Sequence, residues 1–345
     1  YCLGHVALAW DETRLGLFLG LALIALGSGG IKSCVSAHVG DQFCRANAHR
    51  MTEVFAWFYL AINLGAATSS LLTPWLLKIS GPGVAFAVPG LLMALATAVF
   101  FAGRSKFAHI PPAGWKFLAD LVDPEGRQAL LRLVPLFVFV AMFWSLFDQS
   151  GSAWVLQAEK MNRHFLGINW ESAQIQAVNP VLILVLVPLF TRVLYPLVDR
   201  FWKFTPLRRI SVGMFVAAAS FWISAVIESL IQRGLAPTIG WQFLAYLVLT
   251  SAEVLVSVTC LEFAYTQAPK RLKSLVMGMY LLSVSLGNAF TAAVNYVVKL
   301  YHLDAPGNIM AGPGYFWFFV LTMLVTAGLF SLVASFYRGK DVLQD

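Results

Sequence analysis

Three ionisable residues lie deep inside apolar stretches of the chain: Lys32, Asp148 and Glu253. A charged side chain at the centre of a bilayer costs several kcal/mol, so it is tolerated where it faces a partner, a cavity or a substrate. One base and two acids at intermediate depth suit a cavity that holds a zwitterion, in which Lys32 binds a carboxylate and Glu253 an ammonium group. For each residue taken alone, a structural ion pair or a hydrogen-bonded packing role is the alternative.

Both acids have polar neighbours on their own helix face. Trp144 lies one helical turn before Asp148, and Ser257 lies one turn after Glu253. The proline that follows Asn179 frees a backbone carbonyl at about the same depth. Because a carboxylate that leaves water can take up a proton reversibly, such a site meets the requirement of a proton-coupled step.

The composition places the chain in lipid. Of its 345 residues, 59% are hydrophobic and 12% are charged, whereas soluble domains are roughly half apolar and a quarter charged. The net charge of +7 comes from basic residues in loops, with no basic face or stripe, so we expect no nucleic-acid partner. The four cysteines show no paired spacing and the histidines form no HxxxH pair, so we expect no disulfide framework, metal or other cofactor. A membrane metalloenzyme or serine hydrolase is therefore poorly supported, and we expect the protein not to be an enzyme.

Apolar stretches long enough to cross a hydrocarbon layer of about 30 Å as helices recur at short intervals. We predict nine spans, at residues 16–38, 54–77, 84–102, 133–158, 174–198, 208–231, 241–266, 274–298 and 314–337. The residues up to Trp10 look like the tail of a further span, and no initiator Met or signal-peptide pattern precedes them. The predicted fold class is thus an all-α membrane protein, and we expect the chain to be a fragment of a longer one.

A long polar loop divides the spans into three and six. We predict an N-terminal bundle at residues 1–103, a loop at 104–131 and a C-terminal bundle at 132–345. This loop, the C-terminus and every second loop hold sixteen Lys and Arg residues, whereas the opposite loops hold six. By the positive-inside rule the richer side is the cytoplasm, so we expect a multi-pass protein of the cell (inner) membrane with a cytoplasmic C-terminus.

Other polar and small residues of the spans are interpreted as structural. Arg192 and Glu262 lie near the ends of their spans, where long side chains reach the membrane interface. Gly16 and Gly20 permit close contact between helices.

Several long motifs occur in order along almost the whole chain. They run from Gly29-Gly30-Ile31-Lys32 through Phe58-Tyr59-Leu60-Ala61-Ile62-Asn63 and Phe147-Asp148-Gln149 to Leu261-Glu262-Phe263-Ala264-Tyr265-Thr266-Gln267-Ala268-Pro269. In these motifs the chain resembles the proton-dependent oligopeptide transporter family of the major facilitator superfamily. A series of motifs in the right order is more specific than any one of them.

The resemblance implies a major facilitator fold in which the nine spans are helices 4 to 12, without helices 1 to 3. It implies symport of di- and tripeptides with protons, by a monomeric unit in membrane lipid. The peptide would contact residues of a central cavity, namely Lys32, Tyr59, Asn63, Trp144, Asn179, Glu253, Ser257 and Tyr280. Proton coupling or gating would involve Asp148, Glu253 and Lys32, with Asp148 in a gating ion pair.

The chain departs from the family pattern at a few places. Ser33 stands where proline is usual and Tyr280 where tryptophan is common, and both changes are tolerable. The ExxER motif, which the family uses for proton coupling and carboxylate binding, belongs to the absent helices, and its loss would compromise folding and transport. The short segment 232–240 resembles bacterial members.

Two alternatives to peptide symport stay open at this point. One is a related carrier with the same fold for nitrate, amino acids or another small anion. The other is a membrane receptor or intramembrane enzyme that transports nothing.

Overall fold

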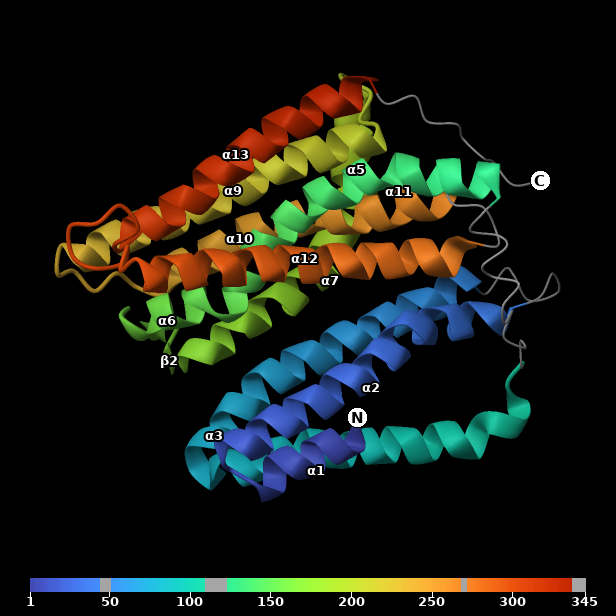
Figure 1. Ribbon diagram of the computed structural model, residues 1–345, viewed down its shortest axis with the longest axis horizontal. Helices are drawn as coiled ribbons and strands as arrows, with labels where there is room; N and C mark the ends of the chain where they lie inside the picture. Colours follow the sequence, from blue (N-terminus) through green and yellow to red (C-terminus); the bar gives the residue numbers. More distant parts are fainter. Residues whose placement is uncertain (44–50, 109–122, 268–271, 337–345) are drawn as a thin grey trace. The chain divides into compact units, whose positions relative to one another are not determined.

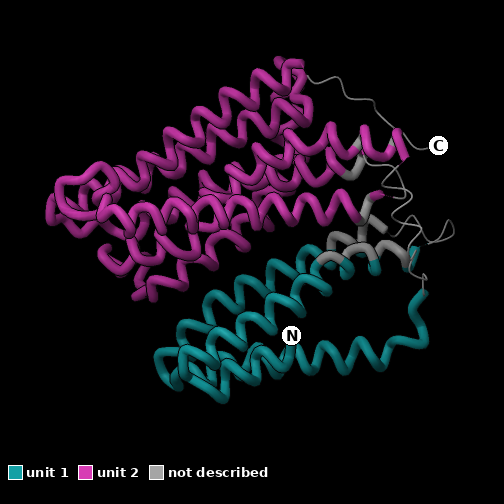
Figure 2. Tube along the Cα trace, in the orientation of Figure 1, with its two compact units in different colours: residues 1–114 teal, residues 115–345 magenta. Residues whose placement is uncertain are grey.

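The computed structural model describes residues 1–43, 51–108, 123–267 and 272–336. The chain forms two compact units, residues 1–114 (unit 1) and residues 115–345 (unit 2), which Figure 2 shows in separate colours. Within the described ranges, eight helices are long and apolar enough to cross a membrane. The protein is therefore an all-α, multi-pass membrane protein, as the composition predicts. Residues 337–345 and residues 109–122, which are half of the predicted inter-bundle loop, lie outside the described residues.

The described residues of unit 1 form three helices and a short 3₁₀ turn (Figure 1). They are α1 (Cys2–Trp10), α2 (Arg14–Asp41), α3 (Met51–Gly103) and η2 (Arg104–Lys106). Asp11 ends α1, and its Oδ1 accepts a hydrogen bond from the backbone N–H of Thr13, 2.9 Å away. Hydrogen bonds from the Thr13 side chain and backbone hold the pKa of Asp11 below its ordinary value. This turn returns the chain so that α1 packs on α2 and on α3.

Helix α3 is interrupted at Gly81, between the predicted spans 54–77 and 84–102. Gly81 has φ 79° and ψ 178°, a backbone conformation that residues with a Cβ rarely adopt. Pro82 follows, and proline is favoured at the start of a helix because its missing N–H would be unpaired there. An unbroken helix of 53 residues would be about 80 Å long, far more than a bilayer requires. The break therefore makes two spanning segments, as the sequence predicts.

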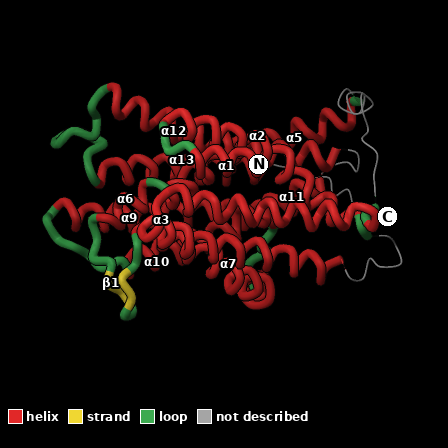
Figure 3. The backbone as a smooth tube through the Cα atoms, turned by 90° about the horizontal axis from the view of Figure 1, so that it is seen from below, coloured by secondary structure: helices red, strands yellow, loops and turns green. Residues whose placement is uncertain are grey.

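Unit 2 is a bundle of long helices (Figures 1 and 3), and aromatic side chains are prominent in its core. Its helical elements are α5 (Pro124–Phe147), η3 (Asp148–Gly151), α6 (Ala153–Glu159), η4 (Ser172–Ala177), α7 (Val178–Leu189), η5 (Phe190–Leu194), α8 (Tyr195–Asp199), α9 (Pro206–Gln232), α10 (Gly240–Glu253), η6 (Val254–Val258), α11 (Thr259–Gln267), α12 (Lys273–Leu300) and α13 (Pro313–Phe336). Helix α13 packs along α9, and α12 packs along α5. The fully buried Phe143, Trp154, Phe221, Tyr246 and Phe319 fill the interior between them.

Helix α5 begins earlier than the sequence predicts. The span was expected from residue 133, after a loop at 104–131, but the helix starts at Pro124. Asp123 caps it, since its Oδ2 accepts a hydrogen bond from the backbone N–H of Gly126 at 3.3 Å. A capping aspartate followed by proline at the first helical position is a strong start signal. Part of the predicted loop is therefore a polar extension of this helix.

A small β-hairpin joins α6 to η4 and was not predicted. Its strands are β1 (His164–Phe165) and β2 (Ile168–Asn169), which pair antiparallel. Leu166 and Gly167 connect them with φ angles of 54° and 76°. Positive φ at both central residues is the geometry of a two-residue hairpin turn.

The predicted spans at 133–158, 174–198 and 241–266 are interrupted rather than regular. The 3₁₀ turn η3 follows α5, and the π turns η5 and η6 lie within the other two spans. A π turn holds one residue more than an α turn and is frequent at functional sites.

Close contact between α5 and α12 occurs at Gly287. A Cβ added there would lie 2.8 Å from the backbone nitrogen of Ser145 and 2.9 Å from Cβ of Trp144. The backbone of α12 therefore approaches α5 at a point where only glycine fits.

We predict that Gly287→Ala destabilises the protein by about 1–3 kcal/mol, because the added methyl group overpacks the contact. Thermal unfolding in detergent measures the loss. Gly278→Ala is the matched control on the same helix, since a Cβ at Gly278 meets no described atom within 4 Å. Equal unfolding temperatures for the two variants would contradict the packing argument.

Candidate functional site

Glu253 lies at the last residue of α10 and is held by a residue of α7. The Nδ2 atom of Asn179 donates to Oε2 of Glu253 at 2.7 Å and to Oγ1 of Thr250 at 3.1 Å. Thr250 is fully buried and Glu253 is half-buried. Because the amide is neutral, this contact positions the carboxylate without neutralising its charge. The site can therefore accept a cationic group or a proton.

A second polar contact lies one turn further along, in η6. Oγ of Ser257 is 2.6 Å from the hydroxyl oxygen of Tyr280 on α12. The Tyr280 ring meets the ring of Trp144 edge to face, with 6.3 Å between the centroids. The buried Nε1 of Trp144 has no hydrogen-bond partner in the part of the chain that the structure describes. A buried donor without a partner is uncommon in folded proteins and marks a position where a ligand carbonyl could bind.

Asp148 is the first residue of η3, where α5 gives way to the 3₁₀ turn. Its Oδ2 accepts a hydrogen bond from Nδ2 of Asn288 at 2.6 Å. This bond joins the end of α5 to α12 through a neutral amide.

The remaining predicted site residues lie in unit 1. Lys32 is exposed on α2, and Tyr59 is exposed on α3. Asn63 is buried, and its Nδ2 donates to the backbone oxygen of Tyr59, one turn earlier, at 2.9 Å. The five predicted substrate contacts of unit 2 lie in two groups: Asn179 is hydrogen-bonded to Glu253, and Tyr280 contacts both the Ser257 hydroxyl and the ring of Trp144. The pairing of Lys32 with the opposite end of a substrate stays a prediction.

Two residues of this site were missed from the sequence, Thr250 and Asn288. Thr250 precedes Glu253 by three residues, a spacing that brings side chains together on a helix, so this signal was available. Asn288 is an amide within an apolar stretch, but its distance of 140 positions from Asp148 left no local signal.

A buried polar network around Glu228 was also missed. Glu228 of α9 is 6% exposed, and its Oε2 accepts from Nε2 of Gln157 on α6 at 2.8 Å. Nζ of Lys160 forms an ion pair with Oε1 of Glu228 at 3.3 Å. The Nε2 of Gln242, on α10, donates to Oε1 of Gln157 at 3.2 Å. The network fastens α6 to α9 and α10, and an acid within the span 208–231 was the signal for it.

We expect Glu228→Leu to lower stability by about 1–3 kcal/mol, because the buried Nε2 group of Gln157 loses one of its two acceptors, Glu228 Oε2, and keeps only the backbone oxygen of Ser224. Lys160→Met serves as the control. Its ammonium group is largely exposed, so the loss of its ion pair should cost about 1 kcal/mol or less. Chemical or thermal unfolding in detergent compares the two variants, and a larger loss for Lys160→Met would refute the assignment.

Interrupted helices that carry buried polar groups inside an apolar bundle are typical of secondary transporters. The architecture is that of a multi-pass helical transporter of the major facilitator type. A sequence model described as the POT family matches residues 1–123 and 115–309, and the chain belongs to this family.

Solved structures and curated relatives agree with this assignment. The crystal structure of an auto-inhibited POT family peptide transporter is 33% identical, covers 100% of this chain with 82% of its own, and superposes with a TM-score of 0.90. The POT family transporter PepTSo is 34% identical over 98% of this chain and 82% of its own, with a TM-score of 0.89. Solute carrier family 15 member 2 of Rattus norvegicus is 37% identical over 76% of this chain. The chain spans less than half of that relative, 43% of its length.

Proposed function

We propose that the protein carries di- and tripeptides across the cell (inner) membrane together with protons. Two helix bundles would expose a midplane site to either side in turn. The observation that carries this proposal is the Glu253 carboxylate, half-buried in an apolar bundle and held by the neutral amide of Asn179. Membership of a family whose solved relatives include peptide transporters supports it.

The five predicted substrate contacts of unit 2 each have a role in this proposal. Glu253 binds the amino group of the peptide, and Asn179 orients the carboxylate. Trp144 donates its Nε1 hydrogen to a peptide carbonyl, while Ser257 and Tyr280 contact the peptide backbone. Because a carboxylate binds either an ammonium group or a proton, Glu253 couples the two cargoes.

The residues of unit 1 complete the site in the proposal. Lys32 binds the peptide carboxylate, with Tyr59 and Asn63 beside the substrate. Lys32 also takes part in gating or proton coupling. Asp148 joins an ion pair that closes one end of the path, and its bond to Asn288 would hold it when that pair is open.

The basic loops orient the protein in this proposal. The C-terminus and the inter-bundle loop face the cytoplasm, since they lie on the side whose loops hold sixteen Lys and Arg residues, against six on the opposite side. The functional unit is a monomer, because each bundle contributes one half of the site.

The direct test is uptake of a labelled dipeptide by the protein in proteoliposomes. Acidifying the outside should drive dipeptide inward, and a protonophore should abolish the gradient-driven part. Unlabelled dipeptide should compete, whereas nitrate and single amino acids should not. Uptake indifferent to the proton gradient would refute symport, and competition by nitrate alone would favour an anion carrier.

Glu253→Gln should reduce dipeptide affinity about 10- to 100-fold, since a hydrogen bond to a charged group contributes about 1.5–3 kcal/mol. It should also remove the response of uptake to the proton gradient. Glu159→Gln removes the same charge from an exposed position at the end of α6 and is the matched control. Equal affinity and equal gradient response in the two variants would contradict the role of Glu253.

Trp144→Phe should weaken dipeptide binding about 3- to 10-fold, because a neutral hydrogen bond contributes about 0.5–1.5 kcal/mol net. The substitution keeps an aromatic ring against Tyr280 and removes the N–H donor. Phe143→Leu alters the packing next to it without removing a donor and is the control. Affinity is measured by equilibrium binding of the labelled dipeptide, and an unchanged affinity in Trp144→Phe would exclude the proposed hydrogen bond.

A further inference from the structure

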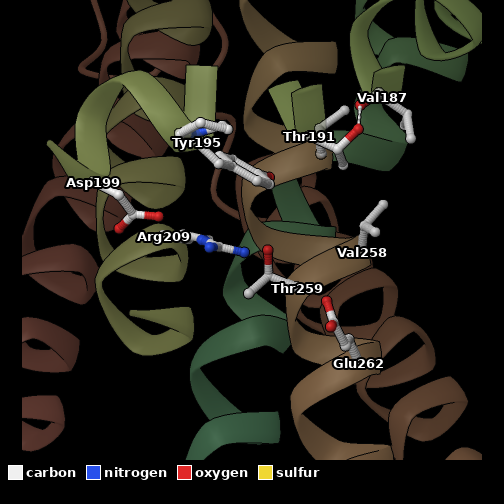
Figure 4. A pocket seen from close by; sticks show the side chains of 10 residues that line it. Val187, Thr191, Tyr195, Asp199, Arg209, Val258, Thr259 and Glu262 are labelled. Atoms are coloured by element: carbon white, nitrogen blue, oxygen red, sulfur yellow. Dashed lines mark hydrogen bonds between the residues drawn. The ribbon is translucent and has the colours of Figure 1, made fainter. Parts of the chain in front are cut away.

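A pocket of about 340 Å³ lies within unit 2, and the side chains described above do not line it. It is formed by the end of α7, by η5, α8, η6 and α11, and by the start of α9 (Figure 4). Its lining residues are Val187, Thr191, Tyr195, Pro196, Asp199, Arg209, Val254, Val258, Thr259 and Glu262. None of them belongs to the predicted site.

Both π turns of unit 2 border this pocket. Thr191 comes from η5, while Val254 and Val258 come from η6. The turn η6 begins directly after Glu253. The pocket and the Glu253 site are therefore joined through a single irregular turn on one spanning segment.

The two sites lie in series along the same pair of segments. With a rise of about 1.5 Å per residue, Glu262 is about 13 Å along the chain from Glu253, and Thr191 is about 18 Å from Asn179. A dipeptide spans only about 7 Å when extended. One dipeptide cannot contact Glu253 and Glu262 at the same time, so the pocket would be a separate binding site.

The pocket presents a fixed cationic group. The guanidinium carbon of Arg209 lies 4.1 Å from the centroid of the Tyr195 ring, and Nε of Arg209 donates to the backbone oxygen of Phe204 at 2.9 Å. Figure 4 shows the outer guanidinium nitrogens directed into the pocket, toward Thr259. Stacking on Tyr195 and the hydrogen bond to the backbone thus orient the guanidinium group of Arg209, and its outer N–H donors are directed toward a position where a carboxylate can bind.

An anionic group faces the same space. Glu262 is exposed on α11, and Figure 4 places its carboxylate beside Thr259. In the described ranges neither Arg209 nor Glu262 forms an ion pair. Asp199, at the rim, already accepts a bond from the backbone N–H of Phe204 at 2.7 Å. A positive and a negative group that do not pair with each other suit a ligand carrying both charges.

We propose that this pocket is a second peptide-binding site, which lies between the Glu253 site and the side that the basic loops assign to the cytoplasm. Arg209 binds the peptide carboxylate, Glu262 binds the amino group, and the valines accept a small side chain. The volume matches a small-molecule site. This inference rests on the proposed peptide transport. It adds a second position that the peptide occupies before its release on the cytoplasmic side. For Glu262 this proposal assigns a role in binding, where the sequence analysis favoured a structural role near the end of a span.

The test measures equilibrium binding of labelled Ala-Ala to the purified protein in detergent. The unaltered protein should bind dipeptide in two classes, and Glu253→Gln should lose the first class and keep the second. In the Glu253→Gln background, Glu262→Gln and Arg209→Gln should each weaken the remaining class at least tenfold. Matched controls in that background are Glu159→Gln and Arg208→Gln. Arg208 lies outside the pocket, with its Nη1 bound to the backbone oxygen of Lys203 at 2.7 Å.

Each outcome separates the two proposals. If the unaltered protein has a single class of dipeptide sites and Glu253→Gln loses all binding, the proposed second peptide-binding site is overturned while peptide binding at Glu253 stands. Retention of the second class in both pocket variants would overturn it as well. No dipeptide binding by the unaltered protein would overturn both proposals. Arg209 packs on Tyr195, so thermal unfolding accompanies Arg209→Gln, and the exposed Glu262 gives the decisive variant if that protein unfolds early.

Discussion

The hydrogen bond from Asn179 to Glu253 is the contact on which the arrangement of unit 2 depends. It joins α7 to α10 with 2.7 Å between its atoms, inside a bundle with an apolar interior. A carboxylate in such a place needs a donor, because an unpaired buried charge is strongly unfavourable. A neutral donor meets this need and keeps the negative charge available. The regular helix α10 ends at Glu253, and the segment continues through the π turn η6 into α11.

The general architecture was accessible from the sequence because lipid imposes simple rules. Apolar length predicted the spans, and Gly81 with Pro82 separated two of them as expected. The ionisable residues within apolar stretches pointed to Asp148 and Glu253, since such residues are expensive in a membrane and persist at polar sites. Both indeed have hydrogen-bond partners on other helices.

The missed features depend on information that local patterns do not carry. Asn288 pairs with Asp148 across 140 positions, and no spacing rule connects them. Leu166 adopts a positive φ in the hairpin, although leucine is not a residue that signals such a turn. The π turns consist of ordinary apolar residues. Glu228 was different, because an acid within a predicted span was visible and its buried partners would have followed from the same rule.

The turn η6 makes its segment tolerant of a lost residue at one place. It contains one residue more than a regular α turn would. Because the wider turn absorbs that residue, deleting one residue between Val254 and Val258 would restore a regular helix and leave Glu262 on nearly the same face relative to Glu253. A deletion in the regular helix α11 before Glu262 would instead rotate the residues after it by about 100°. What the loss of a residue does to this segment therefore depends on whether it falls inside or outside η6.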